Sequence, residues 1–487
     1  MTSTLPEVLR DAAARYPEHT AIRCQGQELT WAELWRRSGR LASILQRRGT
    51  KRGDRVAFYL NKSLESVIAI YGIMRAGAAY VPLDPSAPVD RLRRIVDGCR
   101  VRCLITHPDK LENARLILGS DEPCLPWNEV HESEESAADL IVGPGDLAYI
   151  LYTSGSTGTP KGIVHTHASA IAFCAWAAGE YGLSLADQVS SHAPFHFDLS
   201  TFDLFSAALA GATTVLVPEI LTKFPAALTR FIREERISVW YSVPYALVQM
   251  LERGDLGVAH LESLRWILFA GEPFPPKHLR RLMCMVPARF SNLYGPTETN
   301  VCTYYHVDRP PQDDEPLPIG LPLPSTEALL IGGELLISGP TVMQGYWDRP
   351  DLDERGFLHQ DGKRYYRTGD LVKLDAQGTY HYKGRRDRQI KVRGYRIELD
   401  EIEAALLSHP SVYEAAAYAL PDGSGSHRIE AAVVPCSGFS VVAADLARHI
   451  STLLPRFAMP SAVVLVDELP RTSTGKVDWQ TIRSAIK

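Results

Sequence analysis

Residues 153–162 read Thr-Ser-Gly-Ser-Thr-Gly-Thr-Pro-Lys-Gly and directly follow the apolar run 147–152. Glycines let backbone N–H groups approach an anion closely, hydroxyl groups add donors, and Lys161 adds a positive charge. The same composition fits a flexible Gly/Ser/Thr linker. A Walker loop is excluded, because Lys161 follows Pro160 and lacks the flanking Gly and Ser or Thr of that motif. The stretch therefore predicts either a phosphate-binding loop or a linker.

The bulk composition is typical of a soluble globular protein. With 487 residues, the chain is long enough for two or more domains. A net charge of −5 gives no reason to expect nucleic-acid binding. No apolar run approaches the length of a membrane-spanning helix, and the N-terminus lacks an apolar signal core. We therefore expect a cytoplasmic protein that binds neither nucleic acid nor membrane.

The eight cysteines do not form a zinc-binding pattern. Cys99 and Cys103 are the only close pair, and no second pair completes a set of ligands. We expect reduced, buried thiols.

Strand and helix patterns alternate through the first half of the chain. Residues 30–48 have the apolar spacing of an amphipathic helix. Short apolar runs predict buried strands, and periodic segments between them predict helices. This alternation is typical of an α/β fold with largely parallel sheets. The predicted strands are 56–60, 79–83 and 213–217, and the predicted helices include 64–76 and 225–236.

The character of the chain changes at residues 383–396, where seven of fourteen residues are basic and Asp387 is the only acid. The segment is either a solvated charged hairpin or an anion-facing hinge. Beyond it, residues 400–403 resemble a capping box, with Ile402, Leu406 and Leu407 on one side of the helix. A strand at 429–434, a helix at 444–454 and a strand at 462–466 complete a small α+β domain, which we expect to begin near 384–388.

Ten segments follow one another in a recognisable order. They are residues 29–34, 74–85, 153–162, 197–200 (Phe-Asp-Leu-Ser), 292–299 (Asn-Leu-Tyr-Gly-Pro-Thr-Glu-Thr), 333–339, 366–370 (Tyr-Arg-Thr-Gly-Asp), 384–394, 454–460 and 470–476 (Pro-Arg-Thr-Ser-Thr-Gly-Lys). In this order they resemble the signatures of the adenylate-forming superfamily, which includes acyl-CoA synthetases, luciferases and nonribosomal amino-acid adenylation domains. The resemblance implies a large N-terminal α/β domain built of subdomains, residues 1–386, and a small mobile α+β C-terminal lid, residues 387–487, hinged at Asp387.

The resemblance also implies a ligase reaction with ATP and Mg²⁺. A substrate carboxylate attacks the α-phosphorus of ATP and expels pyrophosphate, so cations must be in place where two anions meet. Glu298 resembles the magnesium ligand, and Lys476 resembles the lid lysine that reaches the substrate carboxylate and the phosphate. The catalytic residues would be Lys476, Glu298, Thr153 and Lys161.

The residues that would bind ATP are inferred from the same resemblance. Tyr294 would lie along adenine, and Asp370 would accept hydrogen bonds from the ribose hydroxyls with Arg385 close by. The full set would be Thr153, Ser154, Gly155, Ser156, Thr157, Gly158, Lys161, Gly271, Glu272, Pro273, Asn292, Tyr294, Gly295, Thr297, Asp370, Tyr382, Arg385 and Lys476.

The substrate class is suggested by Asp198, which matches the aspartate that amino-acid-activating members keep for the substrate ammonium. A buried carboxylate is costly without a cation, although a helix N-cap is an alternative role. The pocket would comprise Phe197, Asp198, Leu199, Phe202, Tyr241, Leu268, Ala270, Leu293, Val301, Cys302 and Lys476. This largely apolar set favours a small apolar substrate and is similar to that of stand-alone enzymes that activate L-proline for a carrier protein, often toward pyrrole-type secondary metabolites.

The acceptor is expected to be a separate peptidyl carrier protein with a phosphopantetheine arm, because only eleven residues follow Lys476 and no Gly-x-Asp-Ser motif is present. The basic segment 383–396 could receive this arm or contact the nucleotide. A CoA ligase of the same fold is an alternative, against which Asp198 argues. A catalytically silent homologue is another, against which the joint presence of Lys476, Glu298 and Asp370 argues.

Overall fold

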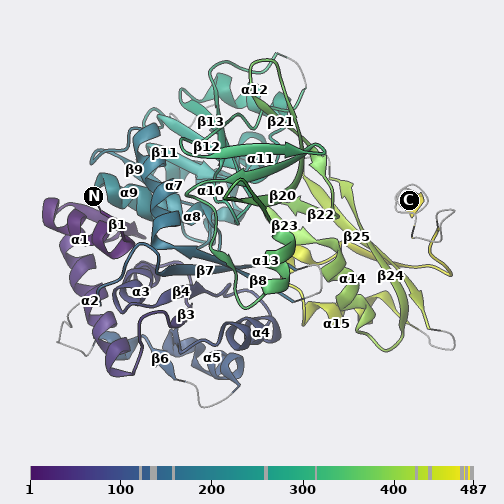
Figure 1. Ribbon diagram of the computed structural model, residues 1–487, viewed down its shortest axis with the longest axis horizontal. Helices are drawn as coiled ribbons and strands as arrows, with labels where there is room; N and C mark the ends of the chain where they lie inside the picture. The colour runs from purple at the N-terminus through teal and green to yellow at the C-terminus, as the bar shows by residue number, and fades with distance from the viewer. Residues whose placement is uncertain are drawn as a thin grey trace.

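The computed structural model describes residues 2–119, 123–131, 140–155, 159–256, 261–312, 315–422, 426–436, 441–471, 477, 481 and 482. A large N-terminal domain and a small C-terminal domain lie side by side, with the C-terminal domain in yellow-green at one edge of Figure 1. The predicted α/β class and the division into a large and a small domain are confirmed.

The first large sheet has the strand order β18-β8-β7-β4-β3-β5-β6 in the described part of the chain. Strands β7, β4, β3, β5 and β6 run parallel, whereas β8 and β18 are antiparallel to their neighbours. Their bounds are β3 Arg55–Tyr59, β4 Ala79–Pro82, β5 Cys103–Thr106, β6 Cys124–Pro126, β7 Leu147–Thr153, β8 Lys161–Thr166 and β18 Gly345–Tyr346. The predicted strands at 56–60 and 79–83 are confirmed as β3 and β4.

The second large sheet has the order β15-β14-β13-β12-β11-β9-β10-β1-β2 among the described residues, and its central strands are parallel. The predicted strand at 213–217 is confirmed as β10. The bounds are β1 Thr20–Cys24, β2 Gln27–Thr30, β9 Gln188–Ser191, β10 Thr213–Leu216, β11 Val239–Ser242, β12 Trp266–Ala270, β13 Arg289–Tyr294, β14 Thr303–Val307 and β15 Leu321–Pro322.

Helices cover and join these two sheets. Helix α2 (Trp31–Arg47) begins with a capping box formed by Thr30 and Glu33 and buries Leu34, Leu41 and Leu45, as its apolar spacing predicts. Helix α3 (Leu64–Arg75) is buried along its whole length and contacts strands of both sheets. One apolar core therefore joins the two large sheets.

The other helices of this domain lie between the two large sheets or on their outer faces. They are α1 Leu5–Arg15, α4 Val89–Cys99, α5 Leu111–Leu118, α6 Asn128–His131, α7 His167–Glu180, α8 Leu199–Thr201, α9 Ala207–Ala210, α10 Pro225–Glu234, α11 Pro244–Arg253 and α12 Pro276–Met285, with a π-helical turn at Phe202–Ser206. The predicted helices at 64–76 and 225–236 are confirmed as α3 and α10.

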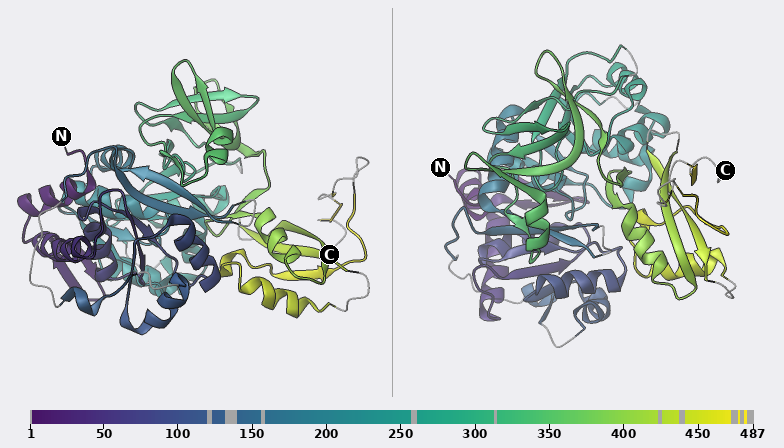
Figure 2. Two further views of the ribbon diagram at one scale, coloured as in Figure 1. Left: turned by 60° about the horizontal axis from the view of Figure 1, so that its bottom comes forward. Right: turned by 45° about the vertical axis from the view of Figure 1, so that its right-hand side comes forward.

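A smaller antiparallel sheet stands apart from the two large ones (Figure 2). It contains β16 Glu327–Ile331, β17 Glu334–Ser338, β19 Phe357–Gln360, β20 Lys363–Leu374 and β21 Tyr380–Arg385, with helix α13 Pro350–Gly356 beside it. Strands β20 and β21 bring the chain to the edge of the C-terminal domain and carry Asp370 and Arg385 opposite each other.

The C-terminal domain is the small α+β unit that the sequence predicts. A hairpin of β22 (Gln389–Val392) and β23 (Tyr395–Glu398) precedes helix α14 (Leu399–Leu407). Strands β24 (Val412–Pro421), β25 (His427–Pro435) and β26 (Ala462–Leu465) form one sheet, and helix α15 (Ala443–Ser451) packs near it.

Three local predictions are wrong. Helix α14 begins at Leu399 and its N-cap Glu398 makes no side-chain capping bond, because Asp400 instead accepts a hydrogen bond from Arg388. Leu407 is exposed, unlike Ile402 and Leu406, because α14 presents only one narrow face to the core.

All eight cysteines are free, but Cys284 is exposed rather than buried. It lies near the end of α12, whose buried side carries His278, Leu279 and Leu282. No helix in the described ranges is long and apolar enough to cross a membrane.

Candidate active site

The predicted site residues gather where β7, β12 and β13 end and where the β22–β23 hairpin of the C-terminal domain faces them. Carboxyl ends of neighbouring parallel strands are where α/β folds build ligand sites. Two adjoining cavities open here, of about 110 and 480 Å³. Residues from both domains line both cavities and form their common wall, namely Gly271, Gly295, Asp370, Arg385, Gln389 and Lys391.

The smaller cavity collects part of the predicted substrate pocket. Phe197, Asp198, Leu199, Tyr241, Ala270 and Val301 line it, together with Val243 and Asn300, which sequence reasoning missed. Phe202 and Leu268 lie in the core behind this wall, where the Phe202 ring meets the Tyr241 ring edge-on with centroids 5.4 Å apart. Leu293 lines the larger cavity instead. Cys302 lies elsewhere, in the buried cluster that contains Tyr294. Fewer residues therefore line the smaller cavity than the sequence predicts for the substrate pocket.

Asp198 occupies the N-cap position of α8, but its side chain makes no capping hydrogen bond. Burial raises the pKa of Asp198, and a hydrogen bond from Thr297 and the charge of Lys391 oppose this rise. Among the described residues, no Lys, Arg or His comes within ion-pair distance of its carboxylate. The N-cap alternative is therefore not the role that this geometry supports.

The larger cavity collects most of the predicted nucleotide residues. Gly271, Glu272, Pro273, Asn292, Tyr294, Gly295, Asp370, Tyr382 and Arg385 all line it. The Tyr294 hydroxyl donates to Asp370 Oδ2 at 2.5 Å, and Arg385 Nη1 donates to Asp370 Oδ1 at 2.6 Å. Phe274, Leu317 and Ile319 add apolar surface. Apolar side chains beside a carboxylate held by two hydrogen bonds suit a base and a ribose diol.

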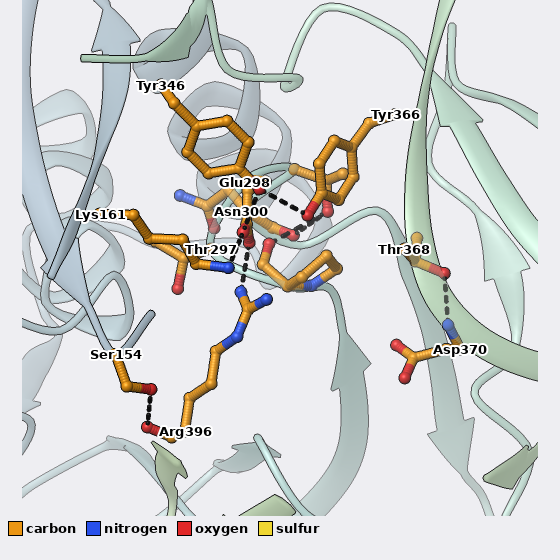
Figure 3. Close-up of polar contacts among 12 residues, drawn as sticks. Ser154, Lys161, Thr297, Glu298, Asn300, Tyr346, Tyr366, Thr368, Asp370 and Arg396 are labelled. Atoms are coloured by element: carbon orange, nitrogen blue, oxygen red, sulfur yellow. Dashed lines mark hydrogen bonds and ion pairs between the residues drawn. The ribbon is translucent and has the colours of Figure 1, made fainter. Parts of the chain in front are cut away.

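Glu298 is fully buried at the centre of a charged cluster (Figure 3). Arg396 Nη1 donates to its Oε2 at 2.5 Å, and the Tyr346 hydroxyl donates to its Oε1 at 2.8 Å. The Lys161 Nζ atom lies 3.6 Å from the same Oε1. Burial alone would raise the pKa of Glu298, but Arg396, Lys161 and these hydrogen bonds hold it well below its usual range. The carboxylate is therefore ionised and paired.

A magnesium ion does not fit Glu298 in this arrangement. Both carboxylate oxygens already face a cationic side chain, Arg396 on one and Lys161 on the other. No group of three or more potential metal-ligating side chains occurs within the described ranges. The predicted metal role of Glu298 would require a different position of Arg396.

The loop at 153–162 enters this cluster from the N-terminal domain. Thr153 and Ser154 line the smaller cavity, and the buried Thr153 hydroxyl has no hydrogen-bond partner among the described residues. The Ser154 hydroxyl donates to the Arg396 carbonyl at 2.9 Å. A Cβ atom on Gly155 would lie 2.2 Å from the Thr159 carbonyl oxygen, so the chain needs glycine there. Ser156, Thr157, Gly158 and Lys476 lie outside the described residues.

The β22–β23 hairpin is the largest feature of the site that sequence reasoning left open. Lys391 lines both cavities, and burial lowers its pKa while the charges of Asp370 and Asp198 oppose this. Arg396 is also largely enclosed, with 13% of its side chain exposed. The solvated-hairpin interpretation is therefore wrong for these two residues, and the anion-facing interpretation agrees with their positions.

Further contacts hold the C-terminal domain against the site. Arg91 on α4 pairs with Glu401 on α14 at 2.6 Å, with side chains 10% and 3% exposed. The Gly394 amide donates to Glu272 at 2.7 Å, and the Phe197 and Tyr395 rings meet with centroids 4.9 Å apart. We call this arrangement the docked lid.

Comparison with known proteins agrees with this geometry. A family model described as AMP-binding enzyme matches residues 9–347, and one described as AMP-binding enzyme C-terminal domain matches residues 401–476. An L-proline--[L-prolyl-carrier protein] ligase of Pseudomonas fluorescens is 39% identical, over 97% of this chain and 97% of the relative. One of Streptomyces coelicolor is 37% identical, over 99% of this chain and 97% of the relative.

A solved structure shows the same fold. The amide bond synthetase McbA from Marinactinospora thermotolerans superposes with a TM-score of 0.88 over 99% of both chains, at 24% identity. The predicted family resemblance is confirmed by the family models, which cover both domains. The chain therefore belongs to the AMP-binding enzyme family, and it is an AMP-forming ligase.

Proposed function

We propose that this ligase activates an amino acid, L-proline, as an aminoacyl-adenylate and transfers it to the phosphopantetheine thiol of a separate carrier protein. The observation that carries the proposal is Asp198, a half-buried carboxylate at the wall of a small cavity, with no cationic side chain within ion-pair distance in the described part of the chain. An ammonium group of a substrate would supply the missing charge.

Proline fits the remaining wall of this cavity. Its three ring methylenes would contact Tyr241, Val243 and Val301, each methylene contributing about 0.8 kcal/mol when buried. Its secondary ammonium would face Asp198. Two relatives that match along nearly the whole chain bear the name L-proline--[L-prolyl-carrier protein] ligase, which supports this choice.

In the first half-reaction, a carboxylate oxygen of proline would bond to the α-phosphorus of ATP while the bond to pyrophosphate breaks. The larger cavity would hold the nucleotide, and Asp370 would accept hydrogen bonds from the ribose hydroxyls. Tyr294 and Arg385 hold the Asp370 carboxylate in place by hydrogen bonds. Thr153 and Lys161 would face the phosphates. We keep Lys476 as the lid lysine of this step, and ATP with Mg²⁺ as the expected co-substrate and metal.

In the second half-reaction, the thiol sulfur would attack the proline carbonyl carbon, AMP would leave and the thiol proton would pass to solvent. Lys391 lies between the two cavities, where it could balance the charge of the departing phosphate. The docked lid is the pose we assign to this step, with Asp387 as the hinge. Asp387 accepts hydrogen bonds from Arg385 at 2.6 and 2.7 Å, at the point where β21 leaves the N-terminal domain.

A third cavity supports an entry route for the arm. It has about 450 Å³, lies between α11 and the hairpin, and shares Phe197, Leu199, Val243 and Tyr395 with the substrate cavity. Lys223, Arg253 and Arg393 also line it. A chain of methylene and amide groups ending in a phosphate would suit an apolar channel with these cations along it.

The test is amino-acid-dependent ATP–pyrophosphate exchange over the twenty amino acids. We expect the highest kcat/KM for L-proline, with smaller or larger ring analogues within roughly 10- to 200-fold. Asp198→Asn should abolish this preference, and Asp348→Asn, a surface control that pairs with Arg100, should not. A charged, polar or large aromatic amino acid that outperforms proline would refute the substrate, although adenylation would stand.

The acceptor is tested by supplying a carrier protein or free CoA to the preformed adenylate. Thioester on the carrier alone supports the proposal, whereas acyl-CoA release favours a CoA ligase. Asp387→Pro should preserve exchange and block loading, because proline fixes the backbone at the hinge. Lys476→Ala should reduce adenylate formation by roughly 10²–10³ and spare transfer from supplied adenylate.

A further inference from the structure

Glu298 joins the two domains through its charge. The carboxylate belongs to the N-terminal domain, in the loop after β13, whereas its hydrogen-bond donor Arg396 comes from β23 of the lid (Figure 3). Lys161 and Glu398 complete the cluster, with Lys161 Nζ 3.6 Å from Glu298 and 3.8 Å from Glu398. Two acidic and two basic side chains therefore form a buried cluster with no net charge.

The backbone of β23 is held in register with this cluster. The Arg396 carbonyl accepts from the Ser154 hydroxyl, and the amide of nearby Gly394 donates to Glu272. These bonds place the guanidinium at Glu298 whenever the lid is docked. A divalent cation on Glu298 would take the same Oε2 atom and would lie beside a like charge in a closed site.

We infer that Arg396 and a divalent cation exclude each other at Glu298, so the docked lid and a metal-bound Glu298 are alternative states of the enzyme. Arg396 is then a positioning residue, because the lid can dock only when no metal ion is bound to Glu298. This inference rests on the proposed function only in taking the cation to be the one that accompanies ATP.

Mutual exclusion at Glu298 makes lid docking sensitive to metal, whereas a contact that only stabilises the docked lid does not. If Arg396 blocks the metal, adding metal must undock the lid, and removing the guanidinium must make docking independent of the metal. Arg91 provides a matched control: it also lines the smaller cavity and its buried pair also stabilises docking, but its partner is Glu401 rather than Glu298. Loss of Arg91 should weaken docking and preserve its sensitivity to metal.

The experiment measures the distance between spin labels in the two domains of the full chain. One label is placed on the exposed Cys284 of α12 and one on Arg448→Cys of α15, with Cys124→Ser and Cys436→Ser to remove the partly exposed thiols. The protein is held with a non-hydrolysable ATP analogue and no amino acid, and Mg²⁺ is titrated.

In the otherwise unmodified protein, we expect saturating Mg²⁺ to lower the ratio of docked to undocked lid by about tenfold, within the range usual for coupled sites. In Arg396→Gln the docked fraction should be smaller at the outset and unchanged by Mg²⁺. In Arg91→Gln it should also be smaller but still fall with Mg²⁺. Arg396→Lys keeps a positive charge and should therefore keep much of the response to Mg²⁺. This variant also tests the inference if Arg396→Gln does not fold.

Full Mg²⁺ sensitivity in Arg396→Gln, or none in the unmodified protein, would overturn the inference. Glu298→Gln removes the shared ligand and should abolish the response as well. Failure of the proposed function has a different signature. In that case no amino acid supports pyrophosphate exchange. The distance measurement contains no amino acid, so it still reports whether Mg²⁺ undocks the lid.

Discussion

Replacing Gly394 by alanine should separate the two half-reactions. Gly394 and Arg393 form the two-residue turn between β22 and β23, with φ of +84° and +53°. A Cβ atom on Gly394 would lie 2.4 Å from Val243 Cγ1 and 3.0 Å from Val243 Cβ. Positive φ costs an alanine about 1–2 kcal/mol, but this strain belongs to the hairpin itself and is present in every lid position. The clash with Val243 exists only when the lid is docked.

Overpacking of this kind costs about 1–3 kcal/mol, which corresponds to roughly 5- to 150-fold in a docking equilibrium. We therefore expect Gly394→Ala to slow carrier loading from preformed adenylate by that factor. Pyrophosphate exchange, which we assign to another lid position, should remain close to its original rate. Single-turnover loading and steady-state exchange measure the two steps separately.

Val243→Ala is the matched rescue, because it removes Cγ1 and Cγ2, including the atom that the new Cβ would meet at 2.4 Å. The double variant should load the carrier faster than Gly394→Ala alone, and the thermodynamic cycle gives the size of the clash. Equal loss in both half-reactions, or no recovery in the double variant, would refute the assignment of this lid position to thioester formation.

Three further changes test the site. Arg91→Glu should weaken lid docking strongly, since breaking a buried pair costs about 3–5 kcal/mol. The reversed pair, Arg91→Glu with Glu401→Arg, should regain docking in the distance measurement, and no regain would show that this pair does not determine docking. Asp198→Asn should lower kcat/KM for proline by roughly 10²–10³ in pyrophosphate exchange without lowering the melting temperature, and a large loss of stability would instead indicate a structural role. His165 binds the Thr297 carbonyl, and burial lowers its pKa to about 4, so between pH 6.5 and 4 the unfolded chain binds a proton that the folded chain does not. Stability should fall as pH falls through this window, by about 1.4 kcal/mol per pH unit from this group, and denaturant unfolding of His165→Gln should show a slope smaller by that amount.

Much of the fold follows from short-range patterns. The spacing of Leu34, Leu41 and Leu45 predicts α2, because a helix of 3.6 residues per turn places them on one face. Apolar runs such as those of β3 and β10 predict buried parallel strands. The order of the segments from 29 to 476 was enough to identify the family. It also predicted site residues around Asp198, Tyr294 and Asp370, which the structure brings to two adjoining cavities.

Other features depend on contacts between residues far apart in the chain. The spacing of residues along the chain could not show that Cys302 packs in the same buried cluster as Tyr294 instead of lining the substrate pocket. Which core a side chain enters after the end of a strand depends on the path of the backbone there. Nor does a run of seven basic residues reveal which of them are enclosed. Lys391 and Arg396 face the site only because the small domain docks there, and Arg396 finds Glu298 and Arg91 finds Glu401 across 98 and 310 positions. The sequence by itself determined the elements and the chemistry available to them, whereas tertiary structure decided which charges meet, because docking of two domains sets both distance and desolvation.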